Sequence, residues 1–155
     1  MSIPENTLKT ALGCGQVQSG PFLCLGSEAV ADIAGRAGFD YVLIDAEHGP
    51  FEPRMIMGQL RALQATGTPA AVRVPGHDDW LLKQTLDAGA QTVMVPMVDT
   101  PEQARQIAKA CRFPPRGRRG NGAANARASG YGTAIDYTVA SNAQVCLIVQ
   151  IESLE

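Results

Sequence analysis

The chain has 155 residues, enough for one domain with a buried core, and its formal net charge is −2. This charge excludes a general attraction to polyanions such as nucleic acids. No apolar run approaches the ~20 residues that a membrane helix needs, so we expect a soluble cytoplasmic protein without a membrane partner. The four cysteines are far apart and form no CxxC pair, which predicts reduced thiols in the core and makes a zinc site improbable.

The first part of the chain alternates predicted helices and strands. A short helix is expected over 4–12 and a strand over 22–25. Ser27 then provides an N-cap for a helix that Gly38 ends, because apolar residues recur between them at helical spacing. A buried strand at 41–44 follows and runs directly into a polar turn.

The same alternation continues to the end of the chain. Further strands are expected at 70–74, 92–95 and 145–151, with helices near 53–66, 79–88, 100–111 and 135–141. The helix near residue 100 begins with a capping box, since Thr100 stands three residues before Gln103. Residues 116–133 are rich in Gly, Ala and Arg and are expected to form a long loop.

Arginines gather around this predicted loop, at positions 112, 116, 118, 119 and 127. No aromatic side chains that could stack on bases are interleaved with them, so nucleic-acid binding is disfavoured. We expect a solvated loop or one that contacts another subunit.

Strands that alternate with helices predict a parallel sheet covered by helices. A doubly wound nucleotide-binding fold would need a GxGxxG turn after a strand, and the segment Gly120-Asn121-Gly122 neither follows a strand nor has the third glycine. We therefore predict the first five βα units of a (β/α)8 barrel. Because such a barrel needs ~250 residues, we expect residues 1–155 to be one barrel domain that is incomplete at its C-terminal end.

Polar residues occupy inward-facing positions near the carboxyl ends of three predicted strands. Side chains alternate between the two faces of a strand, so the apolar neighbours of Asp45, Arg73, Gln150 and Glu152 should meet the helices while these four face the barrel mouth. Inward charges are costly unless they are paired or bind a metal ion, so their convergence indicates a functional site. Barrel enzymes place their chemistry at this end of the strands.

Each of these residues also has a structural interpretation. Asp45 could cap a turn, Arg73 could be an ion-pair partner, and Glu152 could be solvated. His48 stands in a tight-turn context where a catalytic histidine is plausible, whereas the role of Glu47 stays open because regular pleating need not continue past the strand.

The residue types at the predicted strand ends distinguish between two ways of breaking a carbon–carbon bond. A Schiff-base aldolase needs a lysine inside the barrel, but Lys9, Lys83 and Lys109 all fall on predicted helices. An inward Glu with an Arg and an Asp/His pair instead suits an enolate stabilised by a divalent cation. In that chemistry the cation would hold a 2-oxo acid, Arg would stabilise the enolate oxygen, and His would transfer the proton.

An ordered set of motifs resembles the HpcH/HpaI aldolase family, whose members are class II, metal-dependent pyruvate aldolases, and the resemblance implies a barrel of the phosphoenolpyruvate/pyruvate type. The matching segments are Tyr41 to Gly49 (YVLIDAEHG), Val72 to Pro75 (VRVP), Leu86 to Ala90 (LDAGA), Val93 to Pro96 (VMVP), Phe113 to Gly120 (FPPRGRRG) and Gln150 to Glu152 (QIE).

The resemblance implies a role for each site residue. Glu152 would be one of two carboxylate metal ligands, and the second is expected on the next strand, beyond residue 155. Arg73 would bind pyruvate and stabilise its enolate, and Gln150 would line the pyruvate site. His48 with Asp45 would form a dyad that moves the proton of the aldol hydroxyl. The implied cation is Mg²⁺, Mn²⁺ or Co²⁺, and the implied assembly is a homo-oligomer, namely a hexamer.

The leading functional interpretation is a lyase of aromatic catabolism that reversibly cleaves a 4-hydroxy-2-oxo acid to pyruvate and an aldehyde. The alternatives are a citrate-lyase-like acyl-CoA lyase and a non-catalytic truncated barrel fragment that associates with other subunits. Turnover by residues 1–155 alone stays an open question at this point.

Overall fold

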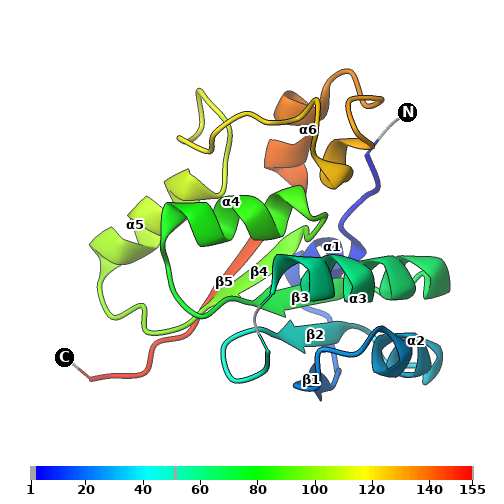
Figure 1. Ribbon diagram of the computed structural model, residues 1–155. Helices are drawn as coiled ribbons and strands as arrows, with labels where there is room; N and C mark the ends of the chain where they lie inside the picture. The colour runs from blue at the N-terminus through cyan, green and yellow to red at the C-terminus, as the bar shows by residue number, and fades with distance from the viewer. Residues whose placement is uncertain (1–2, 51, 155) are drawn as a thin grey trace.

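The computed structural model describes residues 3–50 and 52–154, which form a single parallel sheet with helices against it (Figure 1). Its strands lie side by side in chain order, β1-β2-β3-β4-β5. Their bounds are Phe22–Leu23 for β1, Val42–Asp45 for β2, Ala70–Arg73 for β3, Thr92–Val95 for β4 and Cys146–Val149 for β5. All four strand pairings are parallel, as the alternating pattern predicted.

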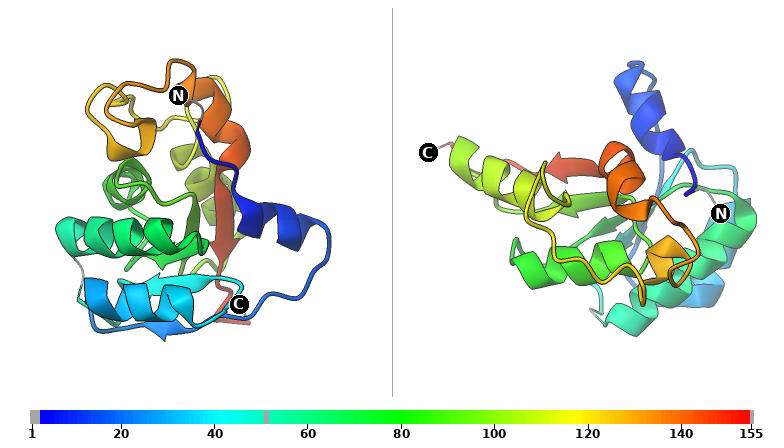
Figure 2. Two further views of the ribbon diagram at one scale, coloured as in Figure 1. Left: turned by 90° about the vertical axis from the view of Figure 1, so that its right-hand side faces the viewer. Right: turned by 90° about the horizontal axis from the view of Figure 1, so that it is seen from above.

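The helices divide between the two faces of the sheet. Their bounds are Thr7–Gly13 for α1, Glu28–Arg36 for α2, Pro53–Thr66 for α3, Asp79–Asp87 for α4, Pro101–Ala110 for α5 and Tyr137–Gln144 for α6, with a 3-10 turn, η1, at Arg127–Ser129. Helices α2 to α5 cover the outer face, and α1 lies across the sheet from them (Figure 2). The sheet thus has an outer face covered by helices and an inner face that carries α1, as expected for the wall of a barrel.

Strand parity separates two apolar clusters. Ile44 and Val72 belong to the larger cluster, in which the outer face packs against Leu63 and other residues of the covering helices. Leu43 and Ala71, one position earlier on the same strands, instead face inward and pack with Leu8 of α1. Successive residues of β2 and β3 thus point to opposite faces, so Asp45 and Arg73 continue the inner face.

Some boundaries differ from the predicted ones. Strand β1 ends at Leu23 because Gly26 takes a positive φ of 63°, which turns the chain away. Helix α1 begins at Thr7 because the Asn6 side chain accepts a hydrogen bond from the Lys9 amide and so caps the helix. Strand β5 is shorter than the expected 145–151, although the Gln150 amide still donates to the Val95 carbonyl at 2.9 Å.

Helices α5 and α6 test two further predictions. The capping box before α5 is confirmed, with the Thr100 hydroxyl accepting from the Gln103 amide and the Gln103 side chain accepting from the Thr100 amide. Helix α6 lies at Tyr137–Gln144, somewhat later than predicted. The Asn142 side chain on α6 bonds both backbone groups of Phe113, so α6 is positioned by the segment that follows α5.

The expectation of a simply solvated arginine loop is wrong for Arg119. Its side chain is 1% exposed and pairs with Asp87 at the end of α4. The guanidinium also lies over the Phe113 ring, 4.4 Å from its centroid. Arg116, by contrast, is exposed as predicted. Charge and sequence spacing did not distinguish the two arginines, because the partners of Arg119 lie on other elements.

The prediction that all four cysteines are core residues is also wrong in part. Cys111 is buried and Cys146 is half-buried, whereas Cys14 and Cys24 are exposed, and all four thiols are free. Cys14 is the C-cap of α1, and Cys24 follows the short strand β1, so neither lies under a covering helix. Within residues 3–50 and 52–154, no helix is long and apolar enough to cross a membrane.

Candidate functional site

Asp45 and Arg73 form the centre of a charged cluster at the carboxyl ends of the strands. Sheet register pairs the two residues directly, as the last residues of β2 and β3. Arg73 Nε donates to Asp45 Oδ1 at 2.9 Å and Arg73 Nη2 to Oδ2 at 2.7 Å, a two-bond pairing of guanidinium and carboxylate. The Asp45 side chain is 2% exposed and that of Arg73 13%. Two buried opposite charges therefore fix each other's orientation.

Asp45 also organises the turn that follows β2. Its Oδ1 accepts hydrogen bonds from the backbone amides of Glu47, at 3.1 Å, and His48, at 3.3 Å. Burial by itself would raise the pKa of Asp45, but the hydrogen bonds from Arg73 and from these two amides outweigh it and lower the pKa to about 2. The same carboxylate raises the pKa of Arg73. The pair is therefore fully charged at neutral pH.

Glu47, whose role the sequence left open, joins this cluster. Its Oε2 lies 3.1 Å from Arg73 Nη1 and 3.8 Å from His48 Nε2, and its side chain is 14% exposed. The ion pair with Arg73 lacks hydrogen-bond geometry, so Oε2 is buried without a hydrogen-bond donor in the part of the chain that the structure describes. Glu47 thus places a second carboxylate beside Arg73, and the same carboxylate lies close to the imidazole of His48.

His48 lies at the mouth of the cluster, where its side chain is 73% exposed. The structure brings the imidazole close to Glu47 and not to Asp45, both of whose oxygens face Arg73. Asp45 contacts His48 only through the backbone amide. The two side chains are not directly paired in this structure, where Arg73 engages both Asp45 oxygens, and the catalytic dyad of Asp45 and His48 stays a prediction.

Gln150 and Glu152 follow β5 at the same end of the sheet. Gln150 Nε2 donates to Glu152 Oε1 at 3.2 Å, and Gln150 Oε1 is buried with no hydrogen-bond partner among the described residues. Glu152 itself is exposed. Because β4 lies between β3 and β5, this pair is separated from Arg73 by one strand. On the other face Leu147 and Val149 pack against the outer core as parity predicted, whereas Ile151, which parity placed with them, is 74% exposed.

The oxygen atoms of this region fit a divalent cation only in part. Across residues 3–50 and 52–154, no group of three or more His, Cys, Asp or Glu side chains is placed to hold a metal ion. Asp45 and Glu47 face Arg73, which leaves the exposed Glu152 carboxylate and the orphaned amide oxygen of Gln150. Such oxygens are the ligands that a hard cation prefers, and substrate or water oxygens usually supply several more.

Phe22 of β1 and Cys24, which follows it, make two contacts with the charged cluster that the sequence did not predict. Arg73 lies over the Phe22 ring, 5.1 Å from its centroid, and the Cys24 thiol donates to Asp45 Oδ2 at 3.5 Å. Burial and the Asp45 carboxylate raise the pKa of Cys24. Phe22 pairs in register with the inward-facing Leu43, so the parity argument applied to β2 and β3 would have placed Phe22 and Cys24 inward as well.

The cluster joins an oriented guanidinium, two carboxylates and an exposed imidazole at one end of a parallel sheet. Such a site can bind an anionic substrate and stabilise an oxygen that becomes negative during reaction. A family model described as HpcH/HpaI aldolase/citrate lyase matches residues 18–155. The chain belongs to this family, and its fold is that of the opening βα units of the family's barrel.

Two relatives and one solved structure give a closer comparison. The chain is 50% identical over 153 residues to a hydroxypyruvate/pyruvate aldolase of Agrobacterium fabrum, covering 99% of this chain and 58% of that protein. It is 51% identical over 154 residues to a 4-hydroxy-2-oxovalerate aldolase of Novosphingobium aromaticivorans, covering 99% of this chain and 58% of that protein. An HpcH/HpaI family protein from Burkholderia cenocepacia superimposes with a TM-score of 0.92 at 41% identity, covering 96% of this chain and 60% of that one. The chain thus spans about three-fifths of the length of these proteins.

Proposed function

We propose that this chain carries the pyruvate-binding part of a metal-dependent aldolase that reversibly cleaves a 4-hydroxy-2-oxo acid to pyruvate and an aldehyde. The observation that carries the proposal is the Arg73 guanidinium, held between Asp45 and Glu47 at the carboxyl ends of β2 and β3. The names of the relatives support it, since they are aldolases of pyruvate, hydroxypyruvate or a hydroxy-oxo acid.

Arg73 is suited to bind the 2-oxo acid. A guanidinium has five N–H donors, and Asp45 takes one from Nε and one from Nη2. The remaining Nη donors are free to bond a substrate oxygen beside Glu47. When the carbon–carbon bond breaks, negative charge moves onto the keto oxygen of the pyruvate fragment, and a fixed, fully charged donor stabilises that oxygen without having to reorient.

His48 is suited to move the proton. In the cleavage direction the 4-hydroxyl must lose its proton as the bond to the pyruvate fragment breaks, and in synthesis the aldehyde oxygen must gain one. The exposed imidazole of His48 can accept and return this proton. We assign its orientation to Glu47, whose Oε2 lies 3.8 Å from Nε2. Asp45 then acts as a positioning residue that fixes Arg73 and the turn.

We propose Glu152 as a ligand of Mg²⁺, Mn²⁺ or Co²⁺, with Gln150 lining the same site. When bound, such a cation acts as a Lewis acid for the 2-oxo acid. The hydrogen bond from Gln150 Nε2 orients the Glu152 carboxylate, and the orphaned Gln150 Oε1 is an acceptor for a donor group of the site's ligand. We further propose that the protein works as a homo-oligomer.

The test uses the complete gene product that carries these residues, stripped of metal and assayed for pyruvate release from 4-hydroxy-2-oxo acids. We expect activity with added Mn²⁺ or Mg²⁺, loss with a chelator, and no recovery in Glu152→Gln, because the amide keeps the shape but not the charge. Glu102→Gln, an exposed carboxylate on α5, is the matched control and should recover like wild type.

Full activity after complete metal removal would refute the proposal. Cleavage restricted to acyl-CoA substrates would favour the acyl-CoA lyase alternative, and no turnover at all would favour a non-catalytic chain.

A further inference from the structure

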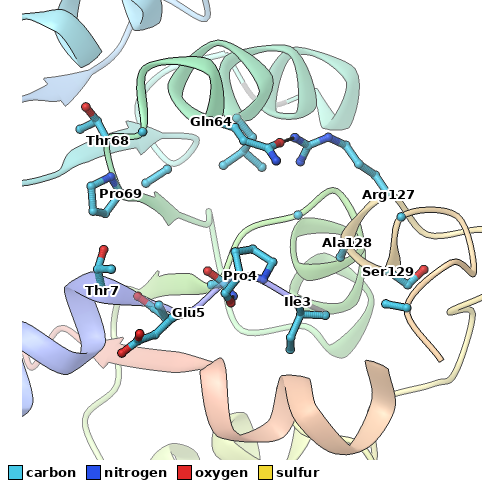
Figure 3. A pocket seen from close by; sticks show the side chains of 18 residues that line it. Ile3, Pro4, Glu5, Thr7, Gln64, Thr68, Pro69, Arg127, Ala128 and Ser129 are labelled. Carbon is cyan, nitrogen blue, oxygen red and sulfur yellow. Dashed lines mark hydrogen bonds between the residues drawn. The ribbon is translucent and has the colours of Figure 1, made fainter. Parts of the chain in front are cut away.

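A second candidate site lies at the opposite ends of the strands. A cavity of about 480 Å³ opens beside the amino ends of β3 and β4, where Pro69, Ala70 and Gln91 form part of its wall (Figure 3). The N-terminal segment, the end of α3 and the residues around η1 complete it. The volume falls within the 300–1,000 Å³ range of small-molecule pockets. The catalytic cluster occupies the carboxyl ends of the same sheet, so this cavity is a separate site.

Arg127 is the cation of the cavity wall, and neutral groups hold its side chain in place. Its Nη1 donates to the Ala88 carbonyl at 2.8 Å, and its Nη2 donates to the Gln64 side chain. Two of the loop arginines pair with an aspartate, Arg118 with Asp79 and Arg119 with Asp87, whereas Arg112 donates to the Ala108 carbonyl. Within the described ranges, no carboxylate forms an ion pair with Arg127, so neutral oxygens alone contact this half-buried cation.

A second guanidinium strengthens this positive field. Burial and the nearby Arg61 both lower the pKa of Arg127, and Tyr131 acts in the opposite direction. Arg61 donates to the Tyr131 hydroxyl at 3.2 Å, another neutral partner. Like charges at short range are costly unless an anion lies between or beside them. The arrangement therefore favours a bound anion.

The remaining lining suits an organic molecule. Pro4, Leu60 and Pro69 supply apolar surface. Glu5 is the other charged residue of the lining; it lies across the cavity from Arg127 in Figure 3, and it accepts a hydrogen bond from the Thr10 hydroxyl at 2.9 Å. Gly89 has a positive φ of 113°, which L side chains rarely adopt, and a Cβ at that position would push the Arg127 guanidinium aside. The glycine thus lets the guanidinium reach its place in the wall.

We propose that this cavity is a binding site for a small organic anion, whose carboxylate or phosphate group pairs with Arg127 and whose apolar part lies against Pro4 and Pro69. The three guanidinium N–H groups of Arg127 that do not bond Ala88 or Gln64 supply the donors. This inference does not depend on the proposed aldolase activity.

The test is isothermal titration calorimetry on the complete gene product at low ionic strength, with inorganic phosphate and with succinate as the two probes. Arg127→Gln removes the charge, and Arg116→Gln removes an equal charge from an exposed position of the same loop. Ala128→Glu leaves Arg127 in place but adds a carboxylate to the lining, which should compete with the anion. Circular dichroism melting checks that each variant folds.

We expect saturable binding to the wild type and to Arg116→Gln, weakened roughly tenfold or more in Arg127→Gln and in Ala128→Glu. Tighter binding of phosphate or of succinate then identifies the anionic group. The comparison isolates the cavity, because any anion bound at Arg73 persists in all three variants. Absence of saturable binding to the wild type by both probes, or wild-type affinity in Arg127→Gln, would overturn the proposal. If Arg127→Gln does not fold, wild-type affinity in Ala128→Glu would overturn it.

Discussion

The guanidinium of Arg73 is constrained from three directions at once. Asp45 bonds its Nε edge, Glu47 lies beside Nη1, and the Phe22 ring lies against its face. A planar donor held in this way cannot rotate freely, so its remaining N–H groups keep a fixed direction toward the site mouth. Asp45 is thereby a structural partner of the residue proposed to bind substrate.

A pH dependence follows from the Asp45 carboxyl. Its pKa of about 2 lies below the ordinary value of about 3.9, so it stabilises the folded state above about pH 4, and that contribution is lost as the pH falls from 4 toward 2. We expect Asp45→Asn to lower the free energy of unfolding in urea by about 2–3 kcal/mol at pH 7 and by about half as much near pH 3. Asp32→Asn removes one half of an exposed ion pair and should change the free energy by less than about 1 kcal/mol at either pH. An Asp45→Asn deficit that is the same at pH 7 and pH 3 would contradict the assigned pKa.

His48 gives a second prediction at this scale. Loss of an acid/base group typically lowers turnover by 10²–10⁴, so His48→Ala should reduce kcat by roughly that factor while KM changes little. His77, an exposed histidine in the loop before α4, is the matched control, and His77→Ala should keep nearly full turnover. Steady-state kinetics of the complete gene product measure both. Equal kcat for His48→Ala and His77→Ala would return His48 to a structural role.

The sequence could place Asp45 and Arg73 but could not choose the partners of Asp45. Period-two alternation is a local rule, and it was enough to turn both residues to the inner face. The competition between Arg73 and the His48 ring for the Asp45 carboxylate depends on strand register and distance. For the same reason the contacts of Glu47, which lies beyond the last strand residue, emerged only from the three-dimensional structure.

At the scale of elements, capping and apolar periodicity predicted the helices well where the signal lies within one element. The Thr100 capping box and the apolar stripe of α5 are examples, whereas Ile33 of the stripe expected on α2 is 69% exposed. The segment between α5 and α6 was predicted only as a loop, because its order comes from distant partners. Arg119 reaches Asp87 on α4 and Tyr137 on α6, at 3.3 Å from the Tyr137 hydroxyl, and so joins three elements that no local pattern connects.

The burial of Arg119 predicts a large effect of its removal. Arg119→Gln leaves Asp87 without its partner and the Phe113 ring without its covering cation, so we expect about 3 kcal/mol lower stability and faster proteolysis within the loop. Arg116→Gln, at an exposed position three residues earlier, should stay within about 0.5 kcal/mol of wild type. Urea unfolding and limited proteolysis measure the two effects. Similar stability of the two variants would show that Arg119 does not anchor the loop.

At the scale of the whole molecule, the five parallel strands carry all the charged residues of the candidate site to one end and the anion cavity to the other. The alternation of strands and helices predicted the parallel sheet, and the missing GxGxxG turn together with the polar strand ends separated the barrel from a nucleotide-binding fold. The described part of the chain superimposes closely on a family structure while covering 60% of it. The central claim is therefore chemical: Arg73 stabilises a pyruvate enolate at the carboxyl ends of the strands.

Exchange of the pyruvate methyl protons for deuterium tests this claim most directly, because exchange requires the enolate and no aldehyde partner. Proton nuclear magnetic resonance would follow the methyl signal of pyruvate in deuterium oxide with the complete gene product and Mn²⁺. We expect exchange by the wild type, with its rate lowered at least about 10²-fold in Arg73→Lys, which cannot hold the two-bond pairing with Asp45. Exchange by folded Arg73→Lys at the wild-type rate, or no exchange by the metal-loaded wild type, would contradict the account.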